Sequence, residues 1–345
     1  MQRLREDYPN EELIGFFYDP NIHPYSEYYL RLLDVRRSCD MLGIELIEGE
    51  YDVDSWLNAV RGLENEPEKG KRCSVCFDRR FRVSAKMADS LKETFWTSTL
   101  LISPKKSIEQ LRRVGEEISK EYGIEFISPD YRKNSGTQQQ NILAKRDKLY
   151  RQNYCGCIFG LKIQRDEQKK LADELFVPIS NQIQPDSIEE RVELYKRRLE
   201  LEAKGINYRI VRERFLNWRL ESALLRVKKE IVPSHIIPYS TLKRDYTRGR
   251  IEYNIENIYY LNRDEVKFVS LELYNKITNC NYKNVMELIF TPPNFDTELN
   301  FRAKVIPNQY DISALIVVDK IPKQKIELHL KSYIYEDIRE ELIEL

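Results

Sequence analysis

The sequence lacks net charge and any long apolar segment. Its 345 residues include 56 Lys and Arg residues against 56 Asp and Glu residues, so overall charge does not indicate a nucleic-acid partner. The first ten residues, MQRLREDYPN, are charged and contain no apolar core, which argues against a secretory signal. The longest aliphatic run near the C-terminus, residues 314–318, is far shorter than the roughly 20 residues that span a bilayer. No internal repeat or low-complexity tract is present.

Cysteine is also scarce, and its distribution is uneven. Four of the six cysteines form two close pairs, Cys73 with Cys76 and Cys155 with Cys157. Two thiol pairs that are distant in sequence are what a tetrathiolate site requires, and both Zn²⁺ and iron–sulfur clusters accept four thiolates. Four ordinary buried cysteines are the alternative, and the spacing does not select the metal. Paired thiols in an unexported protein indicate metal or redox chemistry rather than disulfides, so we expect a cytoplasmic protein with no membrane association.

Strands and helices alternate over residues 1–170. Continuous apolar runs suggest strands buried in a parallel sheet, and amphipathic segments follow each of them. This alternation predicts a doubly wound α/β sheet with functional loops at the carboxyl ends of its strands. We expect strands near 13–18, 44–47, 95–102 and 124–127, and helices near 25–42, 54–60, 73–91, 107–122 and 135–148.

Residues 171–345 have a different pattern and predict a separate C-terminal α+β domain. Residues 188–204 and 213–229 are expected to be amphipathic helices, and residues 191–230 contain 12 basic residues against 6 glutamates. These basic faces suit nucleic-acid backbone contact, with an ordinary solvated face as the equal alternative. Alternating segments at 303–306, 312–318 and 326–330 predict an antiparallel sheet.

Four segments resemble one known family. They are FFYDPNIHPYSEYYLR (16–31), the stretch 47–80 that contains CSVC, TSTLLISPKKS (97–107) and YRQNYCGCIFGL (150–161). Together they resemble the epoxyqueuosine reductase QueH family over about residues 1–165. The resemblance implies a fold like that of the adenine-nucleotide α-hydrolases. It also implies a cobalamin-independent oxidoreductase that converts epoxyqueuosine to queuosine at the wobble position of tRNA with a GUN anticodon, the last step of queuosine biosynthesis.

The resemblance also implies the cofactors. Cys73, Cys76, Cys155 and Cys157 would hold a 4Fe-4S cluster, an additional iron ion would lie nearby, and the electron donor is unknown. Family members usually begin with a strand that ends in two adjacent cysteines, whereas this sequence starts inside the helix that follows. We therefore expect this chain to lack the first strand and the ligands of the additional iron, and to bind a cluster without full activity.

Removal of the epoxide oxygen requires a proton donor. Asp19, His23 and Tyr25, at the end of the strand near 13–18, are the candidates in that order. Each has a structural alternative: Asp19 can cap a turn, His23 can pack in a loop, and Tyr25 can begin the helical core.

Further polar residues are candidates for substrate binding. Glu48 and Asp52 could bind the substrate's amine or diol, and Lys105 and Arg132 could hold tRNA phosphates, although such cations are often unspecific surface residues. Arg151, beside the CGC segment, could tune the potential of an anionic cluster.

Two other functions compete with this interpretation. One is an iron–sulfur-dependent tRNA thiolase of the same fold, which would need a phosphate loop after its first strand. The other is a structural zinc site in a tRNA-binding protein, which would not need the long polar and aromatic loops around the expected crevice.

Overall fold

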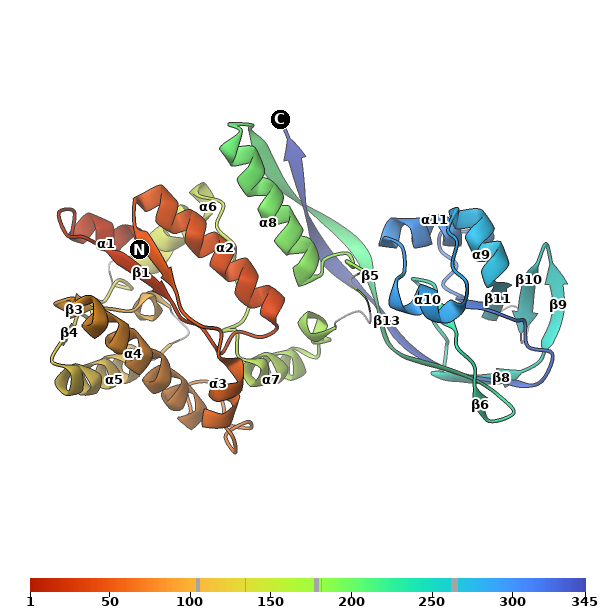
Figure 1. Ribbon diagram of the computed structural model, residues 1–345, viewed down its shortest axis with the longest axis horizontal. Helices are drawn as coiled ribbons and strands as arrows, with labels where there is room; N and C mark the ends of the chain where they lie inside the picture. The colour runs from red at the N-terminus through yellow and green to blue at the C-terminus, as the bar shows by residue number, and fades with distance from the viewer. Residues whose placement is uncertain (104–105, 134, 177–179, 181, 262–265) are drawn as a thin grey trace. The chain divides into compact units, whose positions relative to one another are not determined.

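The computed structural model describes residues 1–103, 106–133, 135–176, 180, 182–261 and 266–345 (Figure 1). The chain divides into two compact units, Met1–Ala172 and Asp173–Leu345. Within the described ranges, no helix is both long and apolar enough to cross a membrane.

Unit 1 is a mixed α/β structure in which strands and helices alternate. Its elements are α1 (Gln2–Asp7), β1 (Ile14–Phe17), α2 (Tyr25–Leu42), β2 (Glu45–Glu48), α3 (Val53–Ala59), α4 (Lys71–Leu91), β3 (Phe95–Trp96), a 3₁₀ helix η1 (Thr99–Ile102), α5 (Ile108–Tyr122), β4 (Glu125–Phe126), α6 (Gly136–Arg146) and α7 (Ile158–Gln168). The strands form two parallel pairs, β1 with β2 and β3 with β4. Among the described residues these pairs are separate two-stranded sheets, so one continuous doubly wound sheet stays a prediction.

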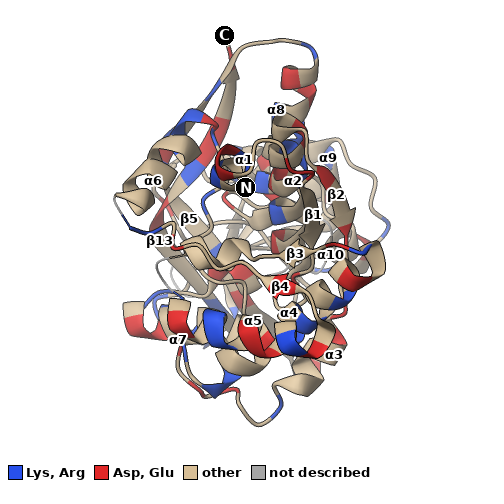
Figure 2. Cartoon of the chain, turned by 90° about the vertical axis from the view of Figure 1, so that its left-hand side faces the viewer, with Lys and Arg blue, Asp and Glu red and all other residues tan. Residues whose placement is uncertain are grey.

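Local signals explain where these helices begin and end. The Ser107 hydroxyl accepts a hydrogen bond from the Gln110 N–H (3.2 Å) at the start of α5, and Gly123 ends that helix with φ +74°. Helices α4 and α5 pack together over a core that includes Phe81, Trp96 and Phe126. Figure 2 shows acidic and basic residues interleaved along α4 and α5, as expected for helices with one buried and one solvated face.

Unit 2 contains two larger sheets. Its elements are a 3₁₀ helix η2 (Asp173–Leu175), α8 (Ile188–Ala203), β5 (Tyr208–Val227), β6 (Glu230–Ile231), β7 (His235–Ile236), β8 (Tyr246–Gly249), β9 (Ile251–Ile255), β10 (Ile258–Leu261), β11 (Val266–Ser270), α9 (Leu271–Thr278), α10 (Val285–Phe290), α11 (Phe295–Val305), β12 (Ala314–Val318) and β13 (Ile326–Glu344). One sheet has the order β7-β12-β11-β10-β9, and β11 and β12 are parallel in it. The other has the order β6-β5-β13-β8, and Figure 1 shows β5 and β13 as a long antiparallel ribbon.

Four predictions for this part of the chain have clear outcomes. Helix α8 confirms the helix expected at 188–204, and β12 confirms the strand expected at 312–318, with all five of its residues buried. The helix expected at 213–229 is wrong, because residues 213–227 lie in β5, which pairs with β13, and residues 228–229 form the turn that follows. The strand expected at 303–306 is also wrong, because these residues end α11, where Val305 and Ile306 pack into the core.

Candidate active site

The first cysteine pair lies in the first two turns of α4. Gly70 precedes the helix, and Cys73 and Cys76 are one turn apart, so both side chains leave the same side of it. The Lys69 N–H donates to Cys73 Sγ at 3.3 Å, while Cys76 is buried. The Cys73 sulfur therefore accepts a backbone hydrogen bond at the N-terminal end of α4.

The second pair lies in a tight turn before α7. Gly156, between the two cysteines, has φ +101°, and a Cβ atom there would lie 2.7 Å from Ile22 Cγ1. The His23 N–H donates to the Gly156 carbonyl at 2.8 Å. These contacts join the CGC turn to the loop that follows β1, and they explain why glycine is required at this position.

The fold brings the two pairs together. Cys76, Cys155 and Cys157 belong to one packed cluster with Trp56, and the thiols of Cys73 and Cys155 are close enough to Cys76 to affect its pKa. All four cysteines line a cavity of about 1370 Å³. In the part of the chain that the structure describes, no three His, Cys, Asp or Glu side chains could hold a metal ion as they stand. The four sulfurs are neighbours that do not converge on one point.

The thiols differ in acidity. A hydrogen bond from the Cys157 thiol lowers the pKa of Cys155 to about 5, against burial and with help from the Lys106 cation. The same hydrogen bond, together with burial, raises the pKa of Cys157. Burial also raises the pKa of Cys76, and the Arg80 guanidinium opposes that shift. The hydrogen bond between the two thiols thus shifts their pKa values in opposite directions.

Arg80 is a site residue that our sequence analysis missed. It lies one helical turn after Cys76, and its guanidinium is near the thiols of both Cys76 and Cys155. Its Nη2 forms an ion pair with Asp19 Oδ1, and its side chain is only 15% exposed. The spacing from Cys76 to Arg80 was a usable signal, because residues i and i+4 are neighbours on a helix. The contact with Asp19 had no local signal in the sequence.

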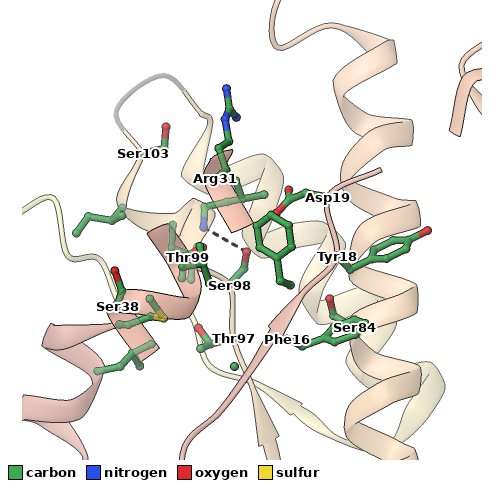
Figure 3. A pocket seen from close by; sticks show the side chains of 18 of the residues that line it. Phe16, Tyr18, Asp19, Arg31, Ser38, Ser84, Thr97, Ser98, Thr99 and Ser103 are labelled. Carbon is green, nitrogen blue, oxygen red and sulfur yellow. Dashed lines mark hydrogen bonds between the residues drawn. The ribbon is translucent and has the colours of Figure 1, made fainter. Parts of the chain in front are cut away.

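One part of the cavity wall carries several hydroxyl groups. Figure 3 shows Thr97, Ser98, Thr99 and Ser103 from the segment after β3, Ser38 from α2 and Ser84 from α4. The Ser98 hydroxyl accepts a hydrogen bond from the Leu100 N–H at 3.2 Å. The cavity therefore offers both donors and acceptors to a polar ligand beside the cysteines.

The three predicted proton donors lie in different environments. Asp19 lines the cavity and faces Arg80. His23 and Tyr25 are not among the described lining residues. His23 is half-buried, and burial lowers its pKa. Tyr25 is 58% exposed. Asp19 is thus the predicted donor that can meet a ligand in the cavity.

The predicted substrate-binding residues are mostly engaged with other parts of the protein. Glu48 forms an ion pair with Arg36 (2.7 Å to Nη2), outside the cavity lining. Asp52 accepts hydrogen bonds from Arg79 Nη2 (2.7 Å) and from the Tyr18 hydroxyl (2.9 Å).

The three predicted cations have different surroundings. Arg132 donates to the carbonyls of Leu101 (2.9 Å) and Lys106 (2.8 Å), and burial lowers its pKa. Arg151 lines the cavity and donates to Asn141 Oδ1 at 3.2 Å. Lys105 lies outside the described residues.

Comparison with known proteins identifies the family. The family model "Epoxyqueuosine reductase QueH" matches residues 1–163. A Helicobacter pylori protein named epoxyqueuosine reductase QueH is 36% identical over 98% of this chain and 95% of its own length. Proteins of the same name are 39% identical in Acinetobacter baylyi, over 43% of this chain and 68% of the relative, and 32% identical in Thermotoga maritima, over 46% and 83%.

Fold and site together define a mixed α/β protein with four neighbouring thiols at the wall of one cavity. The match to the Helicobacter pylori protein covers nearly the whole of both chains, which takes the resemblance well beyond the cysteine motifs. The chain belongs to the epoxyqueuosine reductase QueH family.

Proposed function

We propose that this protein reduces epoxyqueuosine to queuosine at the wobble position of tRNA with a GUN anticodon, in the cytoplasm. The observation that carries the proposal is the meeting of four thiols from two distant motifs at one cavity. The proposed reaction is inferred from family membership, because the relatives are named epoxyqueuosine reductase. The parallel pairs β1–β2 and β3–β4 support the finer proposal of a doubly wound sheet like that of the adenine-nucleotide α-hydrolases.

In this proposal Cys73, Cys76, Cys155 and Cys157 hold a 4Fe-4S cluster. The donor set fits, because such clusters take four thiolates. A second observation supports the fit: Trp56 is buried beside Cys76, and its side-chain hydrogen bond to that sulfur favours the thiolate form that a cluster ligand needs. When bound, the cluster would supply single electrons from a donor still to be identified. The additional iron would need ligands other than these four sulfurs.

The reaction takes two electrons and two protons, and the epoxide oxygen leaves as water while an alkene forms. The chain's own residues would bind and orient the substrate for this change. Asp19, ion-paired with Arg80, can accept hydrogen bonds from a substrate hydroxyl or from a proton-bearing water molecule. The hydroxyl groups of Ser98 and Thr99 would bind polar groups of the nucleoside, and the cavity walls would exclude bulk water.

The first experiment is anaerobic purification of the wild type, Cys155→Ser and Cys280→Ser. Iron and sulfide analysis and electron paramagnetic resonance would measure the cluster, and mass spectrometry of digested tRNA would measure conversion. Cys280 is the matched control, because it lies in unit 2 and outside the two pairs. We expect Cys155→Ser to lose cluster and conversion together, with conversion at least about 100-fold lower, while Cys280→Ser keeps both.

Two results would contradict the proposal. A wild-type protein that binds zinc and no iron would indicate a structural metal site and would contradict the reductase proposal. Conversion that survives in Cys155→Ser after the cluster is lost would exclude this cysteine from the chemistry.

A further inference from the structure

Tyr25 is a large aromatic residue that the fold leaves exposed at the first position of α2. Its ring is stacked with Tyr28 at 5.8 Å and with Tyr29 at 6.5 Å between centroids, with interplanar angles of 26° and 16°. It also meets the ring of Tyr51 edge-on at 5.3 Å. The Tyr25 side chain is nevertheless 58% exposed. An aromatic ring that contacts other rings and still has more than half of its surface exposed can offer a stacking surface to a ligand.

The supporting rings are fixed in place. Tyr28 is buried, packs on Phe17 at 5.2 Å and lies 4.4 Å from Tyr51. The Tyr51 hydroxyl donates to the Ile22 carbonyl at 2.7 Å. The core of unit 1 holds these rings in place. The protein side chains would therefore lose little conformational entropy when a ligand stacks on Tyr25.

This aromatic cluster is continuous with the candidate active site. The segment that carries Tyr25 also carries Asp19 and Ile22, both of which line the cavity. The adjacent His23 N–H is bonded to the carbonyl of Gly156 between two of the cysteines. The exposed ring is thus two residues from a backbone contact with the CGC turn.

We infer that Tyr25 is a stacking platform for an unpaired nucleobase next to the modified nucleotide of the RNA substrate. The inference rests on the proposed function and deepens it by assigning a contact outside the cavity. A modified base can enter the cavity only if it leaves the stack of the anticodon loop, so its neighbours lose a stacking partner. Aromatic side chains replace such partners in proteins that bind single-stranded RNA, and every base presents a suitable face.

The local charges are compatible with an RNA ligand. Of the carboxylates on either side of Tyr51 in sequence, Glu48 and Asp52 are ion-paired with Arg36 and Arg79, and the exposed Glu50 has no ion pair among the described residues. Tyr25 is therefore a positioning residue for RNA, and its ring rather than its hydroxyl is the functional part.

The test uses the anaerobically loaded full chain and an anticodon stem-loop RNA with 2-aminopurine on either side of the wobble position. The variants are Tyr25→Ala, Tyr25→Leu, which keeps apolar bulk without an aromatic face, and Tyr25→Phe. Tyr253→Ala is the matched control, because Tyr253 is also an exposed tyrosine stacked on another, Tyr260 at 4.9 Å, in unit 2. Binding, 2-aminopurine quenching, iron content and thermal midpoint are measured for each.

We expect Tyr25→Ala and Tyr25→Leu to raise the Kd for RNA about 5- to 100-fold and to abolish quenching at one flanking position. Tyr25→Phe and Tyr253→Ala should stay within about twofold of wild type, and iron content should be unchanged in all variants. Wild-type affinity in Tyr25→Ala, or an equal loss in Tyr25→Phe, would overturn the inference. Conversion of epoxyqueuosine in the same wild-type preparation separates the two proposals, since RNA binding with quenching but no conversion would leave the platform intact and reject the reductase.

Discussion

Gly156 shows how one residue without a side chain controls the geometry of two functional ones. Its φ of +101° is a conformation that L side chains rarely adopt, and Ile22 occupies the space that a Cβ atom would need. This turn sets the directions of the neighbouring cysteine side chains. Cys157 is the residue directly before α7. Any change here affects the directions of both thiols.

Gly156→Ala should therefore reduce both cluster content and stability. We expect a loss of about 2–4 kcal/mol in the free energy of unfolding, from backbone strain plus the clash with Ile22, and a fall of more than half in bound iron. Gly43→Ala is the matched control, because Gly43 also has positive φ (+60°) but has no atom within 4 Å of an added Cβ. It should lose only about 1 kcal/mol. Urea denaturation and iron analysis measure both effects, and equal behaviour of the two variants would refute this account.

Some residues of the candidate site could be predicted from the sequence, and others could not. The four cysteines were found from spacing alone, because each pair is local and the fold needed only to bring two pairs together. Arg80 was overlooked although it lies one turn beyond Cys76, and its partner Asp19 is 61 residues away in sequence. The exposure of Tyr25 depends on how Tyr28 and Tyr51 pack, which no local pattern encodes.

The same contrast holds for whole elements. Helices such as α2 and α5 were predictable, because each ends at a glycine, Gly43 or Gly123, and α5 is also amphipathic. Residues 213–229 contain many good helix formers and were expected to be helical, yet β5 pairs with β13 from Tyr208 to Val227. This long-range pairing overrides intrinsic propensity, and the partner strand begins about a hundred residues later.

This pairing changes the interpretation of the basic charge in residues 191–230. Arg212 lies 2.8 Å from Glu340, and Arg214 lies 2.9 Å from Glu336 across the ribbon. The acidic residues near the end of the sequence thus neutralise part of a stretch that looked basic in isolation. Exposed pairs of this kind contribute about 0–1 kcal/mol each to stability, and a paired arginine is less available to phosphates.

Replacing both arginines, in Arg212→Gln/Arg214→Gln, should leave RNA affinity almost unchanged. The slope of log Kobs against log salt should change by less than about 0.5, whereas two lost phosphate contacts would change it by about 1.4–1.8. Lys228→Gln/Lys229→Gln is the comparison, since these exposed lysines at the turn after β5 have no ion pair among the described residues. Anisotropy titrations over a range of salt concentrations measure the slopes. A fall of more than one unit in the arginine variant would show that the ribbon contacts RNA.

At the scale of the whole molecule, each compact unit has its own core and its own group of buried functional or charged residues. Unit 1 is built around the cavity and its thiols, and unit 2 contains a buried charge network. In unit 2 the Asp186 carboxylate is 5% exposed and lies 2.8 Å from Arg191. Burial raises the pKa of Asp186 to about 7, partly offset by Arg191 and reinforced by the Asp337 carboxylate. Burial also raises the pKa of the Asp173 carboxyl.

This network makes the stability of unit 2 depend on pH. An unfolded aspartate has a pKa of about 3.9, so between about pH 4 and pH 7 the folded unit binds a proton that the unfolded chain has already released. The free energy of unfolding should therefore fall as pH rises through this window and level off above pH 7. From Asp186 alone the total decrease is on the order of 4 kcal/mol, at about 1.4 kcal/mol per pKa unit.

Asp186→Asn should remove most of this dependence. Asparagine keeps a similar shape and tolerates the positive φ of 54° at this position, so the backbone should be preserved while the titrating proton is lost. Urea unfolding of the full chain at pH 5 and pH 8, followed by pulsed hydrogen exchange on peptides from α8 and β5, measures unit 2 separately from unit 1. The wild type should be more stable at pH 5 by a few kcal/mol, and the variant should show a clearly smaller difference, with the remainder due to Asp173. Equal pH dependence in both proteins would mean that Asp186 stays ionised in the folded state and that its pairing with Arg191 outweighs its burial.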